Sequence, residues 1–502
     1  MLEVSSLFHN LIFGFGVALS WQNLLYCLIG VSVGTLIGVL PGIGPLGTIA
    51  ILLPITFNVA PVGALIMLAG IYYGAQYGGS TTAILVNLPG ETSSVVTCID
   101  GYQMARQGRA GPALAIAAIG SFFAGTVGTL LIALFGPPLA NVALEFAAPE
   151  YFSLMLMSLV AAAVLAQGDM AKSFAMVALG LLLGIVGTDV NTGVQRFSFG
   201  ITELSDGIGF IVVAVGMFAM GEIIANLGEP EQRSVFGAKV THLFPTWDDM
   251  KQSIGPILRG TALGSFFGVL PGTGPAIASF SSYIVEKKVA ADPSRFGRGA
   301  IEGVAGPESA NNADAQCKFI PMLTLGLPAS GVMALMLGAL TIQGIQPGPE
   351  VMTQRPELFW GLVASMWIGN LMLVVLNLPL IGVWVKLLTV PYRLLFPAIM
   401  AFSAIGIYSV NNSSFEIYLT ALFGVLGFTW TKLGFPAPPL LLGFVLGPMM
   451  EEHLRRAMLM AKGDPTVFVT RPISLAFIII TLIIVIVMVA PVVKKRRGEI
   501  TG

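Results

Sequence analysis

Long apolar stretches follow one another along the chain, separated by short interruptions rich in glycine and proline. Two of these stretches, Gly207–Leu227 and Leu475–Val493, contain very few charged residues. About 20 consecutive apolar residues are enough for a helix to cross a lipid bilayer. The pattern therefore predicts an all-α polytopic membrane protein with about 10–12 transmembrane helices.

One pattern of glycine, proline and apolar residues occurs twice. Residues 30–45 read GVSVGTLIGVLPGIGP and residues 260–275 read GTALGSFFGVLPGTGP. Glycine at every fourth position lets a helix approach its neighbour closely. The PGxGP sequence that follows must break the helix, because proline removes a hydrogen-bond donor and glycine accepts irregular backbone. Breaks inside a membrane are tolerated where they are buried or line a cavity, so we expect broken or re-entrant helices at a binding site.

The repeat extends beyond these motifs, since Asn87–Gly90 resembles Gly326–Ala329. The predicted units are a first membrane repeat at 1–227, a polar linker at 228–255 and a second membrane repeat at 256–502. The second repeat ends in the basic tail Lys494–Arg497, which we expect in the cytoplasm.

Matching loops of the two halves differ in charge. Loop 286–299 contains two lysines and two arginines, whereas the corresponding residues 58–61 are uncharged. Cytoplasmic loops carry the excess of Lys and Arg, so we predict that the two repeats are inverted relative to each other. The alternative is a duplication with parallel halves and chance loop charges.

The breaks and the polar residues near them are candidates for binding an anion. Helices that begin just after each PGxGP motif would point main-chain N–H groups and a positive dipole end at the break, which suits a carboxylate. Amides and hydroxyls within residues 72–91 can bind a carboxylate without burying a charge, although they could instead only join packed helices. The predicted substrate-binding residues of these segments are Pro41, Gly42, Gly44, Gln76, Ser80, Thr81, Asn87, Pro271, Gly272, Thr273 and Gly274.

A third segment, 308–330, gathers polar and charged residues before an apolar run. Its predicted substrate ligands are Asn311, Asn312 and Lys318. Asp314 and Lys318 are four residues apart and could pair on a helix. Asp314 and Asn87 are the candidates for sensing a coupling ion, either sodium or a proton. The alternative is a cytoplasmic helix entrance with solvated charges.

Composition narrows the function classes. The chain is 55% hydrophobic and 10% charged, and its net charge of −1 gives no indication of nucleic-acid binding. Three scattered cysteines argue against a disulfide framework and a metal cluster, and no metal is assigned. The sequence contains no P-loop, HExxH or GxSxG motif, so we expect neither an enzyme nor a bound cofactor.

The blocks GVLPGIGPLGTIAILLP, YYGAQYGGSTTAILVNLPGE and GVLPGTGPAIASFSSYIVEKK, with the segment from NNADAQ to GLPAS, resemble the large membrane subunit of tripartite tricarboxylate transporters, the TctA family. The similarity covers nearly the whole chain. It implies a multi-pass permease of the bacterial inner membrane. It also implies two partners, a small four-helix-type membrane subunit similar to TctB and a periplasmic solute-binding protein similar to TctC.

The resemblance further implies uptake of small organic carboxylates, such as citrate or a related tricarboxylate, driven by an ion gradient rather than by ATP. The loop charges place 58–61, 145–150 and 344–358 on the periplasmic side, where the binding protein would dock. The alternative functions are a channel, or a membrane-embedded enzyme that acts on a small anionic or lipidic substrate.

Overall fold

The computed structural model describes residues 4–40, 44–166, 169–189, 191–227, 243–387 and 392–501. These residues are largely helical, and the two strands among them have two residues each, which confirms the predicted all-α class. The described helices that are long and apolar enough to cross a membrane by themselves are Trp21–Val39, Ala110–Ala143, Ala148–Leu165 and Pro356–Asn377. Six further apolar helical segments have 10–17 residues among those described.

The elements of the first half are α1 (Val4–Ala18), α2 (Trp21–Val39), α3 (Pro45–Thr56), α4 (Pro61–Val86), the 3-10 turn η1 (Thr92–Ser94), α5 (Val95–Arg106), α6 (Ala110–Ala143), α7 (Ala148–Leu165), α8 (Met170–Gly184), β1 (Gly187–Thr188), β2 (Gln195–Arg196), the 3-10 turn η2 (Thr202–Leu204), α9 (Phe210–Ala214), the π-helix η3 (Val215–Met220) and α10 (Gly221–Leu227).

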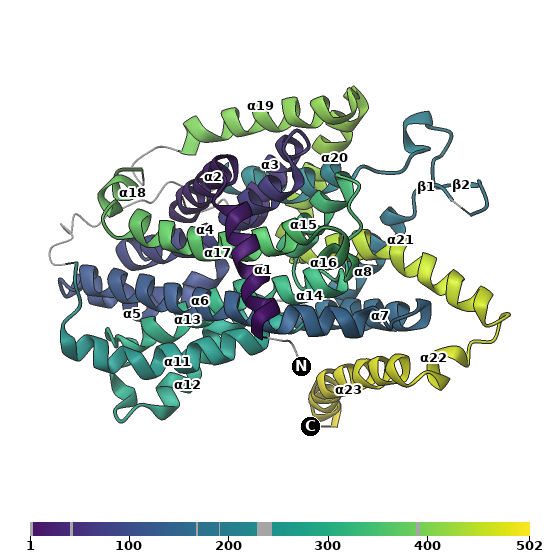
Figure 1. Ribbon diagram of the computed structural model, residues 1–502. Helices are drawn as coiled ribbons and strands as arrows, with labels where there is room; N and C mark the ends of the chain where they lie inside the picture. Colours follow the sequence, from purple (N-terminus) through teal and green to yellow (C-terminus); the bar gives the residue numbers. More distant parts are fainter. Residues whose placement is uncertain are drawn as a thin grey trace.

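The elements of the second half are α11 (Trp247–Val269), α12 (Pro275–Val289), the 3-10 turn η4 (Pro293–Arg295), α13 (Glu302–Cys317), α14 (Phe319–Leu325), α15 (Gly331–Ile342), α16 (Glu350–Gln354), α17 (Pro356–Asn377), α18 (Ile381–Leu387), α19 (Tyr392–Asn411), α20 (Ser414–Lys432), α21 (Ala437–Met460), α22 (Val467–Thr470) and α23 (Pro472–Thr501). In Figure 1, α2 and α3 lie above α4, whereas α11 and α12 lie below α13.

The repeated glycines place α2 against α4 and α11 against α13 in the same way. The distances from a Cβ added to each glycine to a main-chain oxygen of the neighbouring helix are 2.3 Å for Gly30–Met67, 2.5 Å for Gly34–Ile71 and 2.3 Å for Gly38–Ala75. The corresponding distances in the second half are 2.2 Å for Gly260–Gly306, 2.1 Å for Gly264–Ala310 and 2.7 Å for Gly268–Asp314. Only glycine permits such close approach, so the spacing of four selects the face of α2 and α11 that meets the neighbour.

A second helix break follows each of these packed pairs. Asn87 ends α4 with a φ of 58°, and Gly326 ends α14 with a φ of 69°. Both residues have the left-handed conformation that commonly terminates an α-helix. The aligned segments 87–90 and 326–329 therefore begin with the same backbone conformation.

Hydrogen bonds join each half to a loop of the other. Asp100, in α5, accepts three main-chain N–H groups from residues 297–300 at 2.8–2.9 Å. Gln343, just after α15, donates to the main-chain oxygens of Thr56 and Val59 at 2.8 and 3.2 Å. Two inverted copies related by a two-fold axis would exchange contacts in this reciprocal way. The inversion itself stays a prediction.

The polar segment between the halves contains the start of a helix. Residues 228–242 lie outside the described residues, and α11 begins at Trp247, inside the predicted linker 228–255. Thr246 accepts the main-chain N–H of Asp249, and the Asp249 carboxylate accepts that of Thr246. This capping box explains why a polar stretch starts a helix.

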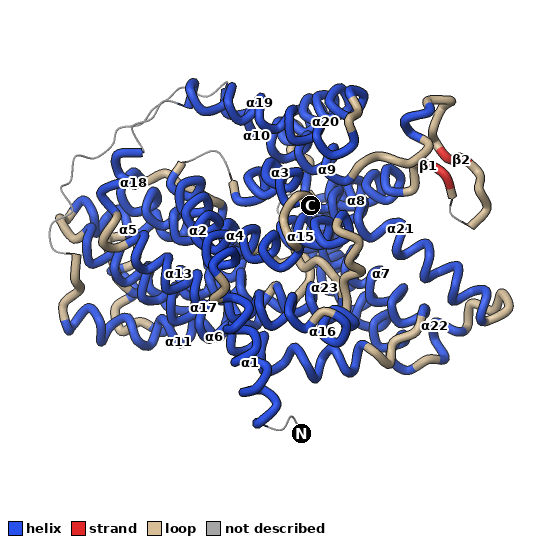
Figure 2. The backbone as a smooth tube through the Cα atoms, turned by 45° about the horizontal axis from the view of Figure 1, so that its top comes forward, coloured by secondary structure: helices blue, strands red, loops and turns tan. Residues whose placement is uncertain are grey.

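A small hairpin of β1 and β2 projects from one end of the molecule (Figure 2). Its charged residues reach the last turns of α21. Asp189 accepts hydrogen bonds from Arg455 at 2.8 and 3.1 Å, and Arg196 pairs with Glu451 at 2.8 Å. Arg455 also pairs with Glu451 at 2.6 Å, so the hairpin is held by a connected ionic network.

Candidate functional site

Helices α4 and α13 come from different halves of the chain, and polar side chains of the two meet inside the molecule. Ser80 Oγ of α4 donates a 2.5 Å hydrogen bond to Glu308 Oε2 of α13, and Thr97 of α5 donates to Glu308 Oε1. Glu308 is only 1% exposed. Each oxygen of this buried carboxyl group therefore has a hydroxyl donor, which offsets part of the cost of removing it from water.

A second carboxyl group, Glu91, lies in the break between α4 and η1. Asn311 of α13 donates from Nδ2 to Glu91 Oε1 at 3.4 Å, while Gln76 Oε1 accepts a 3.1 Å hydrogen bond from Ser93. Glu91 is partly exposed, and Asn311 is buried. We call the following residues the polar cluster: Gln76, Ser80, Glu91, Ser93, Thr97, Glu308 and Asn311.

A buried ion pair lies beside the second hairpin, which is formed by α11, the turn at the second PGxGP motif and α12. Lys318 Nζ is 2.8 Å from Asp314 Oδ1, and both side chains have no exposed surface, so the predicted pairing is confirmed. Lys318 Nζ also lies 3.5 Å from Thr273 Oγ1, in the second PGxGP segment. The alternative of solvated charges at a helix entrance is wrong, because Glu308, Asp314 and Lys318 are all buried.

Helices from the two halves begin next to each other at the breaks. A Cβ added to Gly331, the first residue of α15, would lie 2.6 Å from Leu46 Cδ1 in the first turn of α3. Helix α12, which begins at Pro275, packs against η1, the turn that leads into α5. Each of these contacts joins one half to the other. Helix N-termini present main-chain N–H groups and a partial positive charge, so the breaks favour bound anions.

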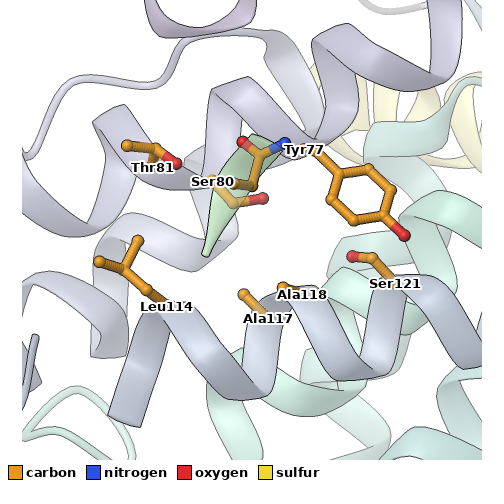
Figure 3. Close-up of a pocket in the computed structure, with 8 residues that line it drawn as sticks. Tyr77, Ser80, Thr81, Leu114, Ala117, Ala118 and Ser121 are labelled. Carbon is orange, nitrogen blue, oxygen red and sulfur yellow. The ribbon is translucent and has the colours of Figure 1, made fainter. Parts of the chain in front are cut away.

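A narrow cavity of about 10 Å³ lies beside the polar cluster, between α4 and α6. Figure 3 shows Tyr77, Ser80 and Thr81 of α4 opposite Leu114, Ala117, Ala118 and Ser121 of α6. This space is about enough for one water molecule. A carboxylate substrate could enter here only if the helices moved apart.

The predicted ligands of the first half lie in different surroundings. Pro41 and Gly42 lie outside the described residues, and Gly44 is the residue that precedes α3. Gln76 and Ser80 belong to the buried polar cluster, and buried Thr81 lines the narrow cavity. Asn87 has an exposed side chain at the end of α4, where its left-handed backbone terminates the helix.

The predicted ligands of the second half lie on the second hairpin and on α13. Pro271, Gly272 and Gly274 form the tip of the hairpin with Thr273, and the Gly272 N–H donates to Ala329 O at 3.0 Å. Asn311 joins Glu91, as described above. Asn312 faces α6 instead, where it donates to Ser121 Oγ at 2.7 Å. The structure therefore separates Asn312 from the group that Asn311 contacts.

Sequence reasoning missed two residues of the polar cluster, the buried Glu308 and the partly exposed Glu91. Glu91 ends the block 72–91, and Glu308 begins the block 308–330. From the sequence alone, a carboxyl group at the border of a polar block could equally be a solvated charge in a loop. The available signal was that each residue belongs to a segment that also carries amides and hydroxyls.

The chemistry of the polar cluster suits small cations or protons more than a transition metal. Within the described part of the chain, no three His, Cys, Asp or Glu side chains are grouped so that they could hold a metal ion. The cluster offers carboxyl, hydroxyl and amide oxygens, whereas Lys318 and the helix N-termini offer positive charge to an anion.

Comparisons with known proteins agree with this architecture. The profile of the tripartite tricarboxylate transporter TctA family matches residues 24–442. A protein of Agrobacterium vitis, described as an uncharacterized 52.8 kDa protein in the TAR-I ttuC' 3' region, is 58% identical over 494 residues, 98% of each chain.

A second protein of Agrobacterium vitis, described as an uncharacterized protein in the TAR-II ttuC' 3' region, is 59% identical over 237 residues. The match covers 47% of this chain and 98% of that protein. No solved structure matches the chain. With the family profile extending over most of its length, the chain belongs to the tripartite tricarboxylate transporter TctA family, as a multi-pass membrane component of such a transporter.

Proposed function

We propose that this chain is the permease of a secondary-active symport system that takes up small organic carboxylates, citrate or a related tricarboxylate among them, across the bacterial inner membrane. A sodium or proton gradient supplies the energy. A periplasmic binding protein delivers the substrate, and a small TctB-like membrane subunit completes the complex.

Two observations carry this proposal: helices of the two halves begin next to each other at the breaks, and polar side chains of the two halves meet inside the molecule. The N-terminus of α3 lies against that of α15, and α12 packs against η1. Lys318, paired with Asp314 in this structure, lies next to the second hairpin and would turn its ammonium group to a substrate that displaces Asp314. Main-chain N–H groups with one ammonium group can hold a carboxylate while the surrounding helices exclude water.

Movement of one half against the other would expose the site to each side in turn. The narrow cavity beside the polar cluster is too small for a carboxylate substrate, so binding at that place would require such a movement. Pseudo-symmetric transporters accomplish it by rocking one repeat against the other around a fixed central site. The hydrogen bonds of Asp100 and Gln343 join the two halves, so this motion would break or rearrange them.

The binding protein would meet the loops that the charge pattern places in the periplasm, 58–61, 145–150 and 344–358. Glu150 contributes little to this surface, because it is 2% exposed and forms an ion pair with Arg471. Shape and a few neutral polar contacts would therefore dominate docking over charge attraction.

Transport by the purified complex in proteoliposomes tests the proposal. Labelled citrate and other di- and tricarboxylates are offered with an imposed sodium or proton gradient, with and without the binding protein, and without ATP. We expect accumulation above the external concentration that requires a gradient and the binding protein. Uptake that stops when the two concentrations are equal would identify a channel, and chemical conversion of the substrate would identify an enzyme.

A further inference from the structure

The polar cluster contains negative charge that no described residue balances. Glu308 is buried, and neither Glu308 nor Glu91 forms an ion pair within the described part of the chain. Lys318 is already paired with Asp314. Removing an ionised carboxylate from water without a positive partner costs about several kcal/mol of free energy. A cation or proton bound at the cluster would offset this cost.

The hydrogen bonds of Asn311 indicate where a proton would fit. Its Nδ2 donates to Glu91 Oε1 at 3.4 Å, and its Oδ1, on a side chain only 1% exposed, has no hydrogen-bond partner among the described residues. An amide beside an ionised carboxylate can hydrogen-bond to it only through the amide N–H group, because both partners' oxygens are acceptors. If Glu91 binds a proton, its new O–H group can donate to Asn311 Oδ1, and the amide and carboxylic acid then satisfy each other.

The cluster is less suited to a sodium ion. Ser80 and Thr97 direct their hydroxyl hydrogens at the two oxygens of Glu308, and Ser93 directs its own at Gln76. Each of these carboxyl and amide oxygens already accepts one hydrogen bond, so a sodium ion would have to collect its several oxygen ligands from the lone pairs that remain. A proton needs a single acceptor, which the partly exposed Glu91 provides at the edge of the cluster.

Among the residues that the structure describes, the other titratable groups around the cluster bring no positive charge to it. Tyr77 of α4 and Cys98 of α5 lie within electrostatic range of Glu308, and Tyr72 lies within range of Glu91. Asp314 of α13 also acts on Glu91, but its charge is balanced by Lys318. Binding of a proton would therefore remove the excess negative charge within the polar cluster.

We propose that Glu91, paired with the amide of Asn311 and placed next to Glu308, binds the proton that drives transport. The inference rests on the proposed function as an ion-coupled permease. It replaces the sequence-based candidates for ion coupling, because Asp314 is held by Lys318 and Asn87 is an exposed helix cap. The step is the binding of H⁺ to the Glu91 carboxylate on one side of the membrane and its release on the other.

The test uses the full complex in sodium-free proteoliposomes with a pH-sensitive dye inside. Glu91→Gln keeps the shape and the partner of the protonated acid but cannot release a proton. We expect wild-type vesicles to accumulate substrate and acidify under an inward proton gradient. The Glu91→Gln complex should exchange internal for external substrate but lose both accumulation and acidification.

Matched variants separate coupling from folding. Glu302→Gln changes a carboxylate on the same helix as Glu308 that is paired with Arg295 outside the polar cluster, and it should behave as wild type. Glu308→Gln should lose accumulation and acidification as Glu91→Gln does. If Glu91→Gln does not fold, Glu308→Gln tests the inference in its place.

Three outcomes would overturn the inference. They are accumulation at the wild-type level by folded Glu91→Gln (or by Glu308→Gln, if Glu91→Gln does not fold), loss of exchange in that folded variant, and wild-type accumulation that follows only a sodium gradient when sodium is supplied. Wild-type vesicles that accumulate no carboxylate with either gradient would instead contradict the proposed function itself.

Discussion

Gly264 of α11 lies against the main-chain carbonyl of Ala310 in α13, and a Cβ added to Gly264 would come within 2.1 Å of that oxygen. Gly264→Ala should therefore destabilise the protein by about 1–3 kcal/mol or more, because two backbones must move apart. The melting temperature of the detergent-solubilised protein measures the effect. Gly16→Ala in α1 is the control, since nothing lies within 4 Å of a Cβ at that position. Equal melting temperatures for the two variants would contradict the close packing.

The tip of the second hairpin contains two glycines with different requirements. Gly272 has a φ of 79°, and its added Cβ would lie 2.6 Å from Ala161 O, whereas Gly274 has a φ of −104° and open space around its Cβ. The left-handed conformation alone costs a non-glycine residue about 1–2 kcal/mol. We expect Gly272→Ala to lower the melting temperature clearly and Gly274→Ala to leave it nearly unchanged. The reverse order would show that the tip has a different conformation.

The ion pair of Asp314 and Lys318 predicts a strong non-additive effect. Lys318→Met leaves the Asp314 carboxylate buried without a partner, which should cost about 3–5 kcal/mol. The double variant Asp314→Asn with Lys318→Met removes both charges and should recover much of that stability. Substrate uptake should stay lost in both, because the ammonium group beside Thr273 is absent. Thermal unfolding and uptake of these two variants and of Asp314→Asn alone provide the measurements, and additive losses would exclude the coupling.

The hairpin of β1 and β2 should respond to acid. Hydrogen bonds from Arg455 and from the main-chain N–H of Asn191 hold the pKa of Asp189 well below its usual range. A carboxyl group with a depressed pKa stabilises the fold above its ordinary pKa of about 4, and this contribution is lost as the pH falls below that value. Asp189→Asn should therefore lower the melting temperature at pH 7. The difference from wild type should shrink steadily below about pH 4. A difference that does not vary with pH would rule out this role of the ion pair.

The sidedness of the loops can be measured directly. Ser294→Cys and Arg106→Cys lie in the basic loops that Asp100 and its partners join, and both positions are exposed. Asn58→Cys and Thr353→Cys are exposed in the loops expected on the other side. In a background without the three natural cysteines, a membrane-impermeant thiol reagent added to intact spheroplasts should label only the second pair. Labelling of one member from each pair would exclude the inverted arrangement.

The sequence revealed those features that depend on local spacing. The glycines of α2 and α11 predicted close helix packing, because a spacing of four residues places them on one helix face. The structure shows that packing in both halves. The pairing of Asp314 with Lys318 was predictable for the same reason, since a helix brings such residues together.

The polar cluster was not predictable, because its members are far apart in the chain. Glu308 meets Ser80 and Thr97 at separations of 228 and 211 residues. Helix α13 also has no purely apolar face, so its pattern alone does not show which side is buried. Asn87 was assigned to the ion site from its polarity, although its position at the end of α4 serves the backbone. Local chemistry thus indicated a polar site, and only the packing of the two halves selected its residues.

Helix α13 is buried from Gly303 to Cys317, although this stretch carries two carboxyl groups and three side-chain amides. A segment of this composition partitions poorly into lipid by itself. During synthesis, α4 and α6 emerge before α13 and supply the Ser80 and Ser121 hydroxyl groups that its polar residues contact. The newly made second half would therefore enter the bilayer against the first half, with the earlier helices serving as the surface on which α13 is inserted.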